Sequence, residues 1–336
     1  MSITAKELAA KLSLSAATVS MVLNNKPGIS GSTRTRVLEA ARKYGYEFRK
    51  TPEPSVESTI SFVIYKKHGV VVADTPFFTE LIEGIVRACQ DSNCFPQISY
   101  YYEKESFDVQ AERGNYHSCA GMILLGTEME PADLRQFQQL RIPLVILDCY
   151  YDEVAADFVL INNTQGAFLA TSYLIQSGHR KVGYLKSSVQ ISNFSERANG
   201  YYNALRRYGM DTSHPYVIEV TPQAERCYED TMRYLKNEPA LATAYFADND
   251  IIAAAAIRAF SMCGYRVPED ISVVGFDDMP ICQLTTPSLS TMSVPKHALG
   301  AAAVTRLLEK IQNPQSEHRK ISLSTVLIRR NSVKLL

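Results

Sequence analysis

The run from Lys6 to Asn25, KELAAKLSLSAATVSMVLNN, decides how the amino-terminal part of this chain folds. Thr4 stands three residues before Glu7, a spacing that lets the two residues cap the first turn of a helix reciprocally. Leu8 and Leu12 follow at a spacing of four, so they lie on one face of that helix. This pattern predicts a short amphipathic helix at the start of the chain.

A second helix is expected after Ser15, because serine is a good helix cap. Its apolar face is formed by residues spaced three and four apart: Val19, Val22 and Leu23. A third helix is expected to begin at Ser30 or Ser32 and to stop at Gly45. Three short helices around a small core predict a helix-turn-helix domain over residues 1–46.

Charge separates this head from the rest of the chain. Residues 1–50 contain nine Lys or Arg and three acidic residues, a net charge of +6. The whole chain has 35 residues of each sign, so residues 51–336 carry 26 basic and 32 acidic residues, a net charge of −6. A basic helical head suits the phosphate backbone of DNA, whose binding is driven by counterion release. The alternative is a small helical bundle with a solvated charged face.

The same region resembles a known family. Ala17-Thr18-Val19-Ser20, Val22-Leu23-Asn24 and the stretch from Thr33-Arg34 to Tyr44-Gly45-Tyr46 closely resemble the DNA-binding head of the lactose-repressor (LacI/GalR) family of bacterial transcription regulators. The resemblance implies that Ser15 to Asn24 is a recognition helix lying in the major groove. It also implies a set of DNA-contacting residues: Ser15, Ala16, Ala17, Thr18, Ser20, Met21, Asn24, Lys26, Thr33 and Arg34.

Two kinds of contact are implied within that set. Some residues are expected to bind phosphates, which fix register without reading sequence, namely Thr18, Ser20 and Asn24. Others match the base-reading positions of the family, namely Ala16, Ala17 and Met21. The family often has arginine in place of Met21, so direct readout is expected to use apolar contacts, for example with thymine methyl groups. Ser13 occupies the turn position where glycine is usual, which predicts a left-handed backbone there.

Residues 47–59, EFRKTPEPSVEST, are expected to form a linker. Pro52 and Pro54 disfavour helical geometry in the residues before them. Members of the family usually form a short hinge helix here, but its alanine-arginine-x-leucine pattern is missing. An extended tether is therefore predicted in place of a hinge helix.

The remainder, residues 60–336, alternates strand and helix patterns. Expected strands lie at 60–65, 97–101, 121–125, 143–148, 158–161, 181–186, 216–220, 243–247, 271–276, 289–294 and 321–329. Such alternation predicts parallel α/β sheets covered by helices on both faces, and the length accommodates two of them. Markers such as Arg197-Ala198-Asn199-Gly200-Tyr201 and Gly275-Phe276-Asp277-Asp278 extend the family resemblance through this region.

The implied fold of residues 60–336 is a two-lobed core like that of type I periplasmic binding proteins, with three crossovers near Asn162, Ser290 and Lys320. The first lobe is then expected at residues 60–161 and 291–320, and the second at 162–290 and 321–336. Ligands of such sheets bind beyond the carboxyl ends of the strands.

The resemblance implies six effector-binding residues: Phe77, Phe78, Asp148, Arg197, Asn249 and Asp277. Asp148 ends an apolar strand, so its carboxylate is expected to accept hydroxyl hydrogen bonds in the cleft, with a turn or cap role as the alternative. Arg197 can donate a bidentate pair of hydrogen bonds to two hydroxyls or to a carboxylate. The alternative is that it forms a surface salt bridge. Phe77 and Phe78 either pack against a ligand ring or fill the core. Asp250 and Asp278 are expected to be structural partners.

No catalytic or metal site is expected. The six histidines form no ligand-spaced cluster, and neither phosphate-binding loop motifs nor a nucleophile elbow is present. Neither a secretion signal nor a run of 18 apolar residues occurs, so a cytoplasmic protein without a membrane partner is expected. The seven cysteines contain no C-x-x-C pair, which favours reduced thiols.

These observations predict a homodimeric, sequence-specific transcriptional regulator, a repressor, that binds a near-palindromic double-stranded DNA operator. A small-molecule effector, a sugar by resemblance, would bind between the lobes, and no cofactor is expected. The alternative from another class is a solute-binding protein without a DNA role. That alternative predicts a secretion signal and no basic head, and the sequence shows the reverse.

Overall fold

The computed structural model describes residues 4–23, 29–44, 46, 59–72, 76–213 and 216–336. The chain divides into two compact units, Met1–Ser55 and Val56–Leu336. Asn24, Lys26 and Gly45 lie outside the described residues, as does most of the predicted linker. The absence of a hinge helix therefore stays a prediction.

The amino-terminal unit contains α1 (Ala5–Leu12), α2 (Ala16–Leu23) and α3 (Gly31–Lys43). The predicted reciprocal cap is present, since Thr4 N donates to Glu7 Oε2 at 2.8 Å and Glu7 N donates to Thr4 Oγ1 at 3.3 Å. Ser13 ends α1 with a φ of 55°, the left-handed backbone expected from the sequence. The helices share a small apolar core formed by Leu8, Ala9, Val19, Val22, Val37, Ala40 and Ala41.

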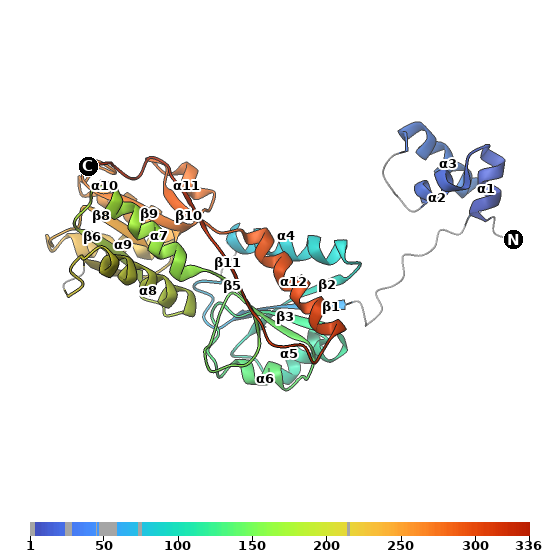
Figure 1. The fold of residues 1–336 in the computed structure, drawn as a ribbon, viewed down its shortest axis with the longest axis horizontal. Helices are drawn as coiled ribbons and strands as arrows, with labels where there is room; N and C mark the ends of the chain where they lie inside the picture. Colours follow the sequence, from blue (N-terminus) through green and yellow to red (C-terminus); the bar gives the residue numbers. More distant parts are fainter. Residues whose placement is uncertain (1–3, 24–28, 45, 47–58, 73–75, 214–215) are drawn as a thin grey trace. The chain divides into compact units, whose positions relative to one another are not determined.

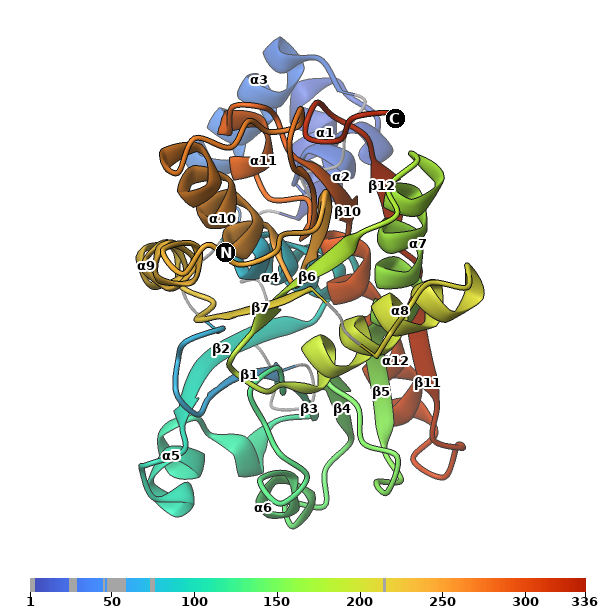
Figure 2. The same cartoon turned by 90° about the vertical axis from the view of Figure 1, so that its left-hand side faces the viewer.

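The larger unit contains two six-stranded sheets (Figures 1 and 2). The first has the order β11-β5-β4-β3-β1-β2, and all of its pairs are parallel. Its strands are β1 (Thr59–Lys66), β2 (Phe95–Tyr102), β3 (Gly121–Leu125), β4 (Leu144–Leu147), β5 (Asp157–Ile161) and β11 (Lys320–Leu323). Its helical segments are α4 (Pro76–Asp91), α5 (Phe107–Arg113), η2 (Tyr116–Ser118), α6 (Leu134–Gln138) and α12 (Lys296–Gln312).

The second sheet has the order β12-β10-β9-β8-β6-β7, and only its β10–β12 pair is antiparallel. Its strands are β6 (Val182–Ser187), β7 (Val217–Val220), β8 (Ala244–Ala247), β9 (Ser272–Asp277), β10 (Ser290–Ser293) and β12 (Val326–Ile328). Its helices are α7 (Asn163–Gln176), α8 (Ser192–Arg207), α9 (Ala224–Leu235), α10 (Asp250–Met262) and α11 (Ile281–Leu284). The predicted two-lobed α/β fold is confirmed.

The chain passes between the sheets three times, and two of the expected crossing points are wrong by a few residues. The first crossing, at Asn162, agrees with the prediction. The second follows β10, whose pairing with β9 continues to Ser293, so the crossing lies after the expected Ser290. The third lies between β11 and β12 and not near Lys320.

The expected single strand over residues 321–329 is also wrong. It is two strands, one in each sheet, separated by Ser324 and Thr325. Sheet membership depends on which neighbouring strand supplies hydrogen bonds, and an apolar pattern along one segment does not contain that information.

Close helix packing shapes the first lobe. In Figure 1, α4 and α12 lie side by side. A Cβ at Gly84 of α4 would lie only 2.4 Å from the backbone oxygen of His297, so glycine is what allows the two helices to approach this closely. In the described part of the chain, no helix is both long and apolar enough to cross a membrane.

Candidate ligand cavity and DNA-binding face

A cavity of about 290 Å³ opens between the two lobes at the carboxyl ends of their strands. All six residues that sequence reasoning assigned to effector binding line it: Phe77, Phe78, Asp148, Arg197, Asn249 and Asp277. They come from α4 and the end of β4 in the first lobe, and from α8, the start of α10 and the end of β9 in the second. The fold thus brings together residues that lie up to 200 positions apart in the sequence.

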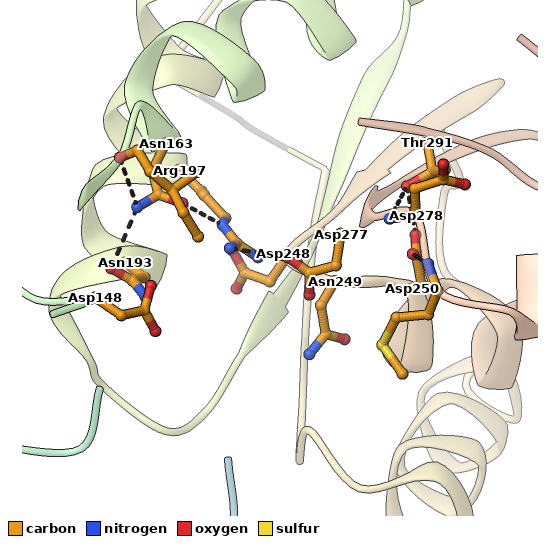
Figure 3. A network of polar contacts seen from close by, with 12 residues as sticks. Asp148, Asn163, Asn193, Arg197, Asp248, Asn249, Asp250, Asp277, Asp278 and Thr291 are labelled. Atoms are coloured by element: carbon orange, nitrogen blue, oxygen red, sulfur yellow. Dashed lines mark hydrogen bonds and ion pairs between the residues drawn. The ribbon is translucent and has the colours of Figure 1, made fainter. Parts of the chain in front are cut away.

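Arg197 is the central cation of this cavity (Figure 3). Its Nε donates to Asn163 Oδ1 at 2.9 Å, its Nη1 to the Asp248 backbone oxygen at 2.5 Å, and its Nη2 to Asp277 Oδ1 at 3.2 Å. The guanidinium also lies over the Phe276 ring, 3.8 Å from its centroid. Because Arg197 is only 3% exposed, the alternative of a surface salt bridge is excluded.

Asp148 connects the two lobes. It follows β4 with a φ of 65°, and its Oδ2 accepts from Thr127 Oγ1 at 2.6 Å. Its Oδ1 accepts from Asn193 Nδ2 on α8 at 3.0 Å, a hydrogen bond across the cleft (Figure 3). Burial raises the pKa of the Asp148 carboxyl to about 6.

Asp277 and Asn249 form part of the cavity wall on the second lobe. Burial raises the pKa of Asp277, although the positive charges of Arg197 and Lys296 act in the opposite direction. Asn249 lines the cavity and also caps α10, because its Oδ1 accepts from Ile252 N at 2.9 Å. The asparagine therefore has a structural role in addition to its place in the cavity wall.

Asp250 has the structural role expected from the sequence. Its Oδ2 accepts from Met279 N at 2.8 Å and its Oδ1 from Thr291 Oγ1 at 2.6 Å, so it fixes the turn after β9. Burial and the nearby charge of Asp277 raise the pKa of Asp250 to about 7. Asp278 is also structural, since it accepts from Arg330 Nη2 at 2.7 Å.

The apolar part of the cavity is largely aromatic. Phe77 and Phe78 begin α4 with their rings edge to face, 5.1 Å between centroids. They are 7% and 8% exposed and belong to the core of the lobe as well as to the cavity wall. The core role left open by the sequence is therefore confirmed, whereas packing against a ligand ring stays a prediction. Phe194 of α8 also lines the cavity.

Sequence reasoning missed several lining residues: Val70, Val71, Thr127 and Asn193. Asn193 lies in the first turn of α8, which begins at Ser192, and the sequence marker of this helix begins only at Arg197. Thr127 follows a buried strand, and that position is the signal that could have pointed to it.

In the head, α2 presents an exposed face of small residues. Ser15, Ala16, Ala17 and Ser20 are exposed, whereas Val19 and Val22 of the same helix are buried. Ser15 Oγ accepts from Thr18 N at 3.0 Å, which caps the helix as expected. The other described members of the predicted set, Thr18, Met21, Thr33 and Arg34, are partly exposed.

The comparisons with known proteins agree with this architecture. Residues 4–47 match the model of "Bacterial regulatory proteins, lacI family", and residues 171–333 match a "Periplasmic binding protein-like domain". The ribose operon repressor of Haemophilus influenzae is 30% identical, over 98% of this chain and 98% of its own. The chain belongs to the lacI family of bacterial regulatory proteins.

Solved structures of regulators share the fold. The complex of the transcriptional regulator CelR with cellobiose has a TM-score of 0.72 and 24% identity, over 98% of this chain and 99% of its own. The lac repressor dimer bound to operator and the anti-inducer ONPF has a TM-score of 0.73 and 21% identity, over 99% and 100% of the two chains. The family membership makes the chain a transcriptional regulator and not an enzyme.

Proposed function

We propose that this protein is a repressor that binds a near-palindromic operator as a homodimer and responds to a polar small molecule bound between its lobes. The observation that carries the proposal is the cavity, whose walls come from both lobes and include the Asp148–Asn193 hydrogen bond between them. A ligand that prefers one lobe arrangement shifts the population of arrangements, and this is how a signal reaches the DNA-binding heads.

The proposed ligand is an uncharged polyhydroxyl compound such as a sugar. Arg197 is the one basic residue among the described lining residues, and its charge is already paired with Asp277. The cavity therefore offers an anion no uncompensated positive charge, whereas Asp148 and Asp277 offer acceptors for hydroxyl groups. Phe77, Phe78 and Phe194 supply apolar surface for a ring face. The ribose repressor and the CelR–cellobiose complex are consistent with this class of ligand.

The proposed DNA contacts are those implied by the sequence. Thr18, Ser20, Asn24 and Arg34 would bind phosphates, Ser15 would position α2, and Ala16, Ala17 and Met21 would meet base edges. Dimerisation would place two recognition helices one turn of DNA apart. The lac repressor, a structural neighbour, was solved as a dimer on its operator, which supports this arrangement.

Two measurements test the proposal. Binding to genomic DNA fragments, selected and then titrated at several salt concentrations, should show a specific site and an affinity that falls steeply with salt. Absence of specific binding would refute the repressor function and favour the solute-binding alternative.

The ligand is tested by thermal shift with a panel of sugars, nucleobases and sugar phosphates. Matched pairs, such as glucose with glucuronate and ribose with ribose 5-phosphate, isolate the effect of ligand charge. The neutral member should give the larger rise in Tm, and a larger rise with the anion would contradict the proposed ligand class.

A further inference from the structure

Glu128 is a buried carboxylate surrounded by backbone amides. It follows β3 and is 3% exposed. Its Oε2 accepts from three consecutive amides, Lys67 N at 3.0 Å, His68 N at 3.1 Å and Gly69 N at 2.8 Å. Its Oε1 accepts from Val71 N and Val72 N, both at 2.8 Å. One side chain thus fixes the described part of the segment that joins β1 to α4.

The five amides explain how this buried charge is tolerated. An ionised carboxylate away from water is costly unless hydrogen bonds replace its hydration. Burial by itself would raise the pKa of Glu128, but the hydrogen bonds from Val72, Gly69 and Val71 outweigh it and the pKa is lowered. Since the amides belong to the loop after β1 and the carboxylate to the segment after β3, ionised Glu128 sets the path of the loop.

This loop is part of the ligand cavity. Val70 and Val71 line it, and they lie between the amides that Glu128 holds. The residue next to Glu128, Thr127, donates to Asp148 in the same cavity. The segment after β3 therefore fixes both a polar acceptor and an apolar wall.

We propose that Glu128 is a positioning residue for ligand binding, which holds Val70 and Val71 in place as the apolar wall of the cavity. The inference rests on the proposed function of that cavity as the effector site. Glu128 does not line the cavity itself, so it acts on the ligand through the loop. Removing its charge should loosen this wall and weaken binding, while the DNA-binding head is unaffected.

The test compares Glu128→Gln with Glu130→Gln. Glutamine keeps the size of the side chain but replaces one acceptor oxygen with an NH₂ group, which faces amide donors and cannot accept from them. Glu130 is a matched control, because its exposed carboxylate pairs with the side chain of Lys67, at 3.1 Å, and not with the loop amides.

Hydrogen exchange of the amides of residues 67–69, 71 and 72 is measured first, without any ligand. In Glu128→Gln these amides should exchange at least about tenfold faster than in the wild type, and in Glu130→Gln at the wild-type rate. Unchanged protection in Glu128→Gln would overturn the proposal.

Binding is then measured by calorimetry with D-ribose and with cellobiose as probes, and operator affinity by fluorescence anisotropy without sugar. Glu128→Gln should weaken sugar binding about tenfold or more and leave operator affinity within about twofold. A variant with unaltered sugar affinity would refute the positioning role, and an equal loss of both affinities would show a general loss of structure. If wild-type protein binds neither sugar, the neutral compound that gives the largest Tm rise in the panel described above replaces them as the probe, and hydrogen exchange decides separately whether Glu128 holds the loop.

Val71→Ala tests the same cavity wall even if the Glu128→Gln variant does not fold. It keeps the amide that Glu128 binds and removes only the side chain that lines the cavity. Sugar affinity should fall severalfold with the loop amides still protected, and unchanged affinity would show that the wall does not contact the sugar.

Discussion

Replacing Asp148 with asparagine should stabilise the protein at high pH. Burial raises the carboxyl pKa of Asp148 from 3.8 to about 6, so folding favours the protonated form. The unfolded chain ionises at the ordinary value, so the stability of the wild type falls as the pH rises from about 4 through 6. At about 1.4 kcal/mol for each pH unit between the two pKa values, the ionised carboxylate lowers the free energy of unfolding by roughly 3 kcal/mol above pH 6.

Asparagine carries no charge, and it can still accept from one neighbour of Asp148 and donate to another. Asp148→Asn should therefore be roughly 3 kcal/mol more stable than the wild type at about pH 8, a rise in Tm on the order of 5–10 °C. The gain should be about half as large at pH 5 and should nearly vanish at pH 4. Thermal unfolding of both proteins, followed by circular dichroism across this range, measures the difference at each pH.

Asp157→Asn is a matched control with the opposite sign. Asp157 is also buried, but hydrogen bonds from Arg306 Nε at 2.7 Å and Arg319 N at 2.9 Å outweigh the effect of burial and lower its pKa. Removing this charge breaks the buried ion pair with Arg306 and leaves that guanidinium only the half-exposed Glu309 as a described carboxylate partner, at 2.9 Å, which should cost about 3–5 kcal/mol at pH 8. A gain for Asp148→Asn that does not change between pH 8 and pH 4, or a loss at pH 8, would refute the argument from burial.

Three further changes have defined outcomes. Arg197→Ala should abolish the ligand-induced thermal shift and, by leaving Asp277 unpaired, cost about 3–5 kcal/mol of stability. Its operator affinity should match that of the exposed control Arg206→Ala, and equal loss of ligand and DNA binding would mark Arg197 as purely structural. Arg34→Ala should weaken operator binding and reduce the salt slope by about one, and an unchanged slope would remove it from the phosphate contacts. Gly84→Ala should lower Tm by several degrees, because overpacking against α12 costs about 1–3 kcal/mol. An unaltered Tm would contradict the inference that a Cβ at residue 84 meets the backbone oxygen of His297 at 2.4 Å.

Most of the fold could be predicted from the sequence, because the patterns that indicate helices, strands and turns are local. The capping pair of Thr4 and Glu7, the left-handed Ser13 and the alternation of strand and helix all follow from residues within a few positions of one another. Three of the six expected cavity residues, Asp148, Asn249 and Asp277, lie at strand ends, which meet at one edge of a parallel sheet. The other three, Phe77, Phe78 and Arg197, lie on helices and were expected from the family resemblance. The sequence prediction was wrong at β11 and β12, because it treated as one strand two segments that belong to different sheets.

The sequence by itself determined the basic head, the order of strands and helices, and the residue types that reach the cleft. Only the tertiary structure decided which groups meet there: Asn193 with Asp148 across 45 positions, and Glu128 with the loop amides across about 60. The first contact depends on how the two sheets are aligned, and the second on how β1 and β3 pair within one sheet. Such alignment is a property of many distant side chains together, and no single stretch of sequence contains it.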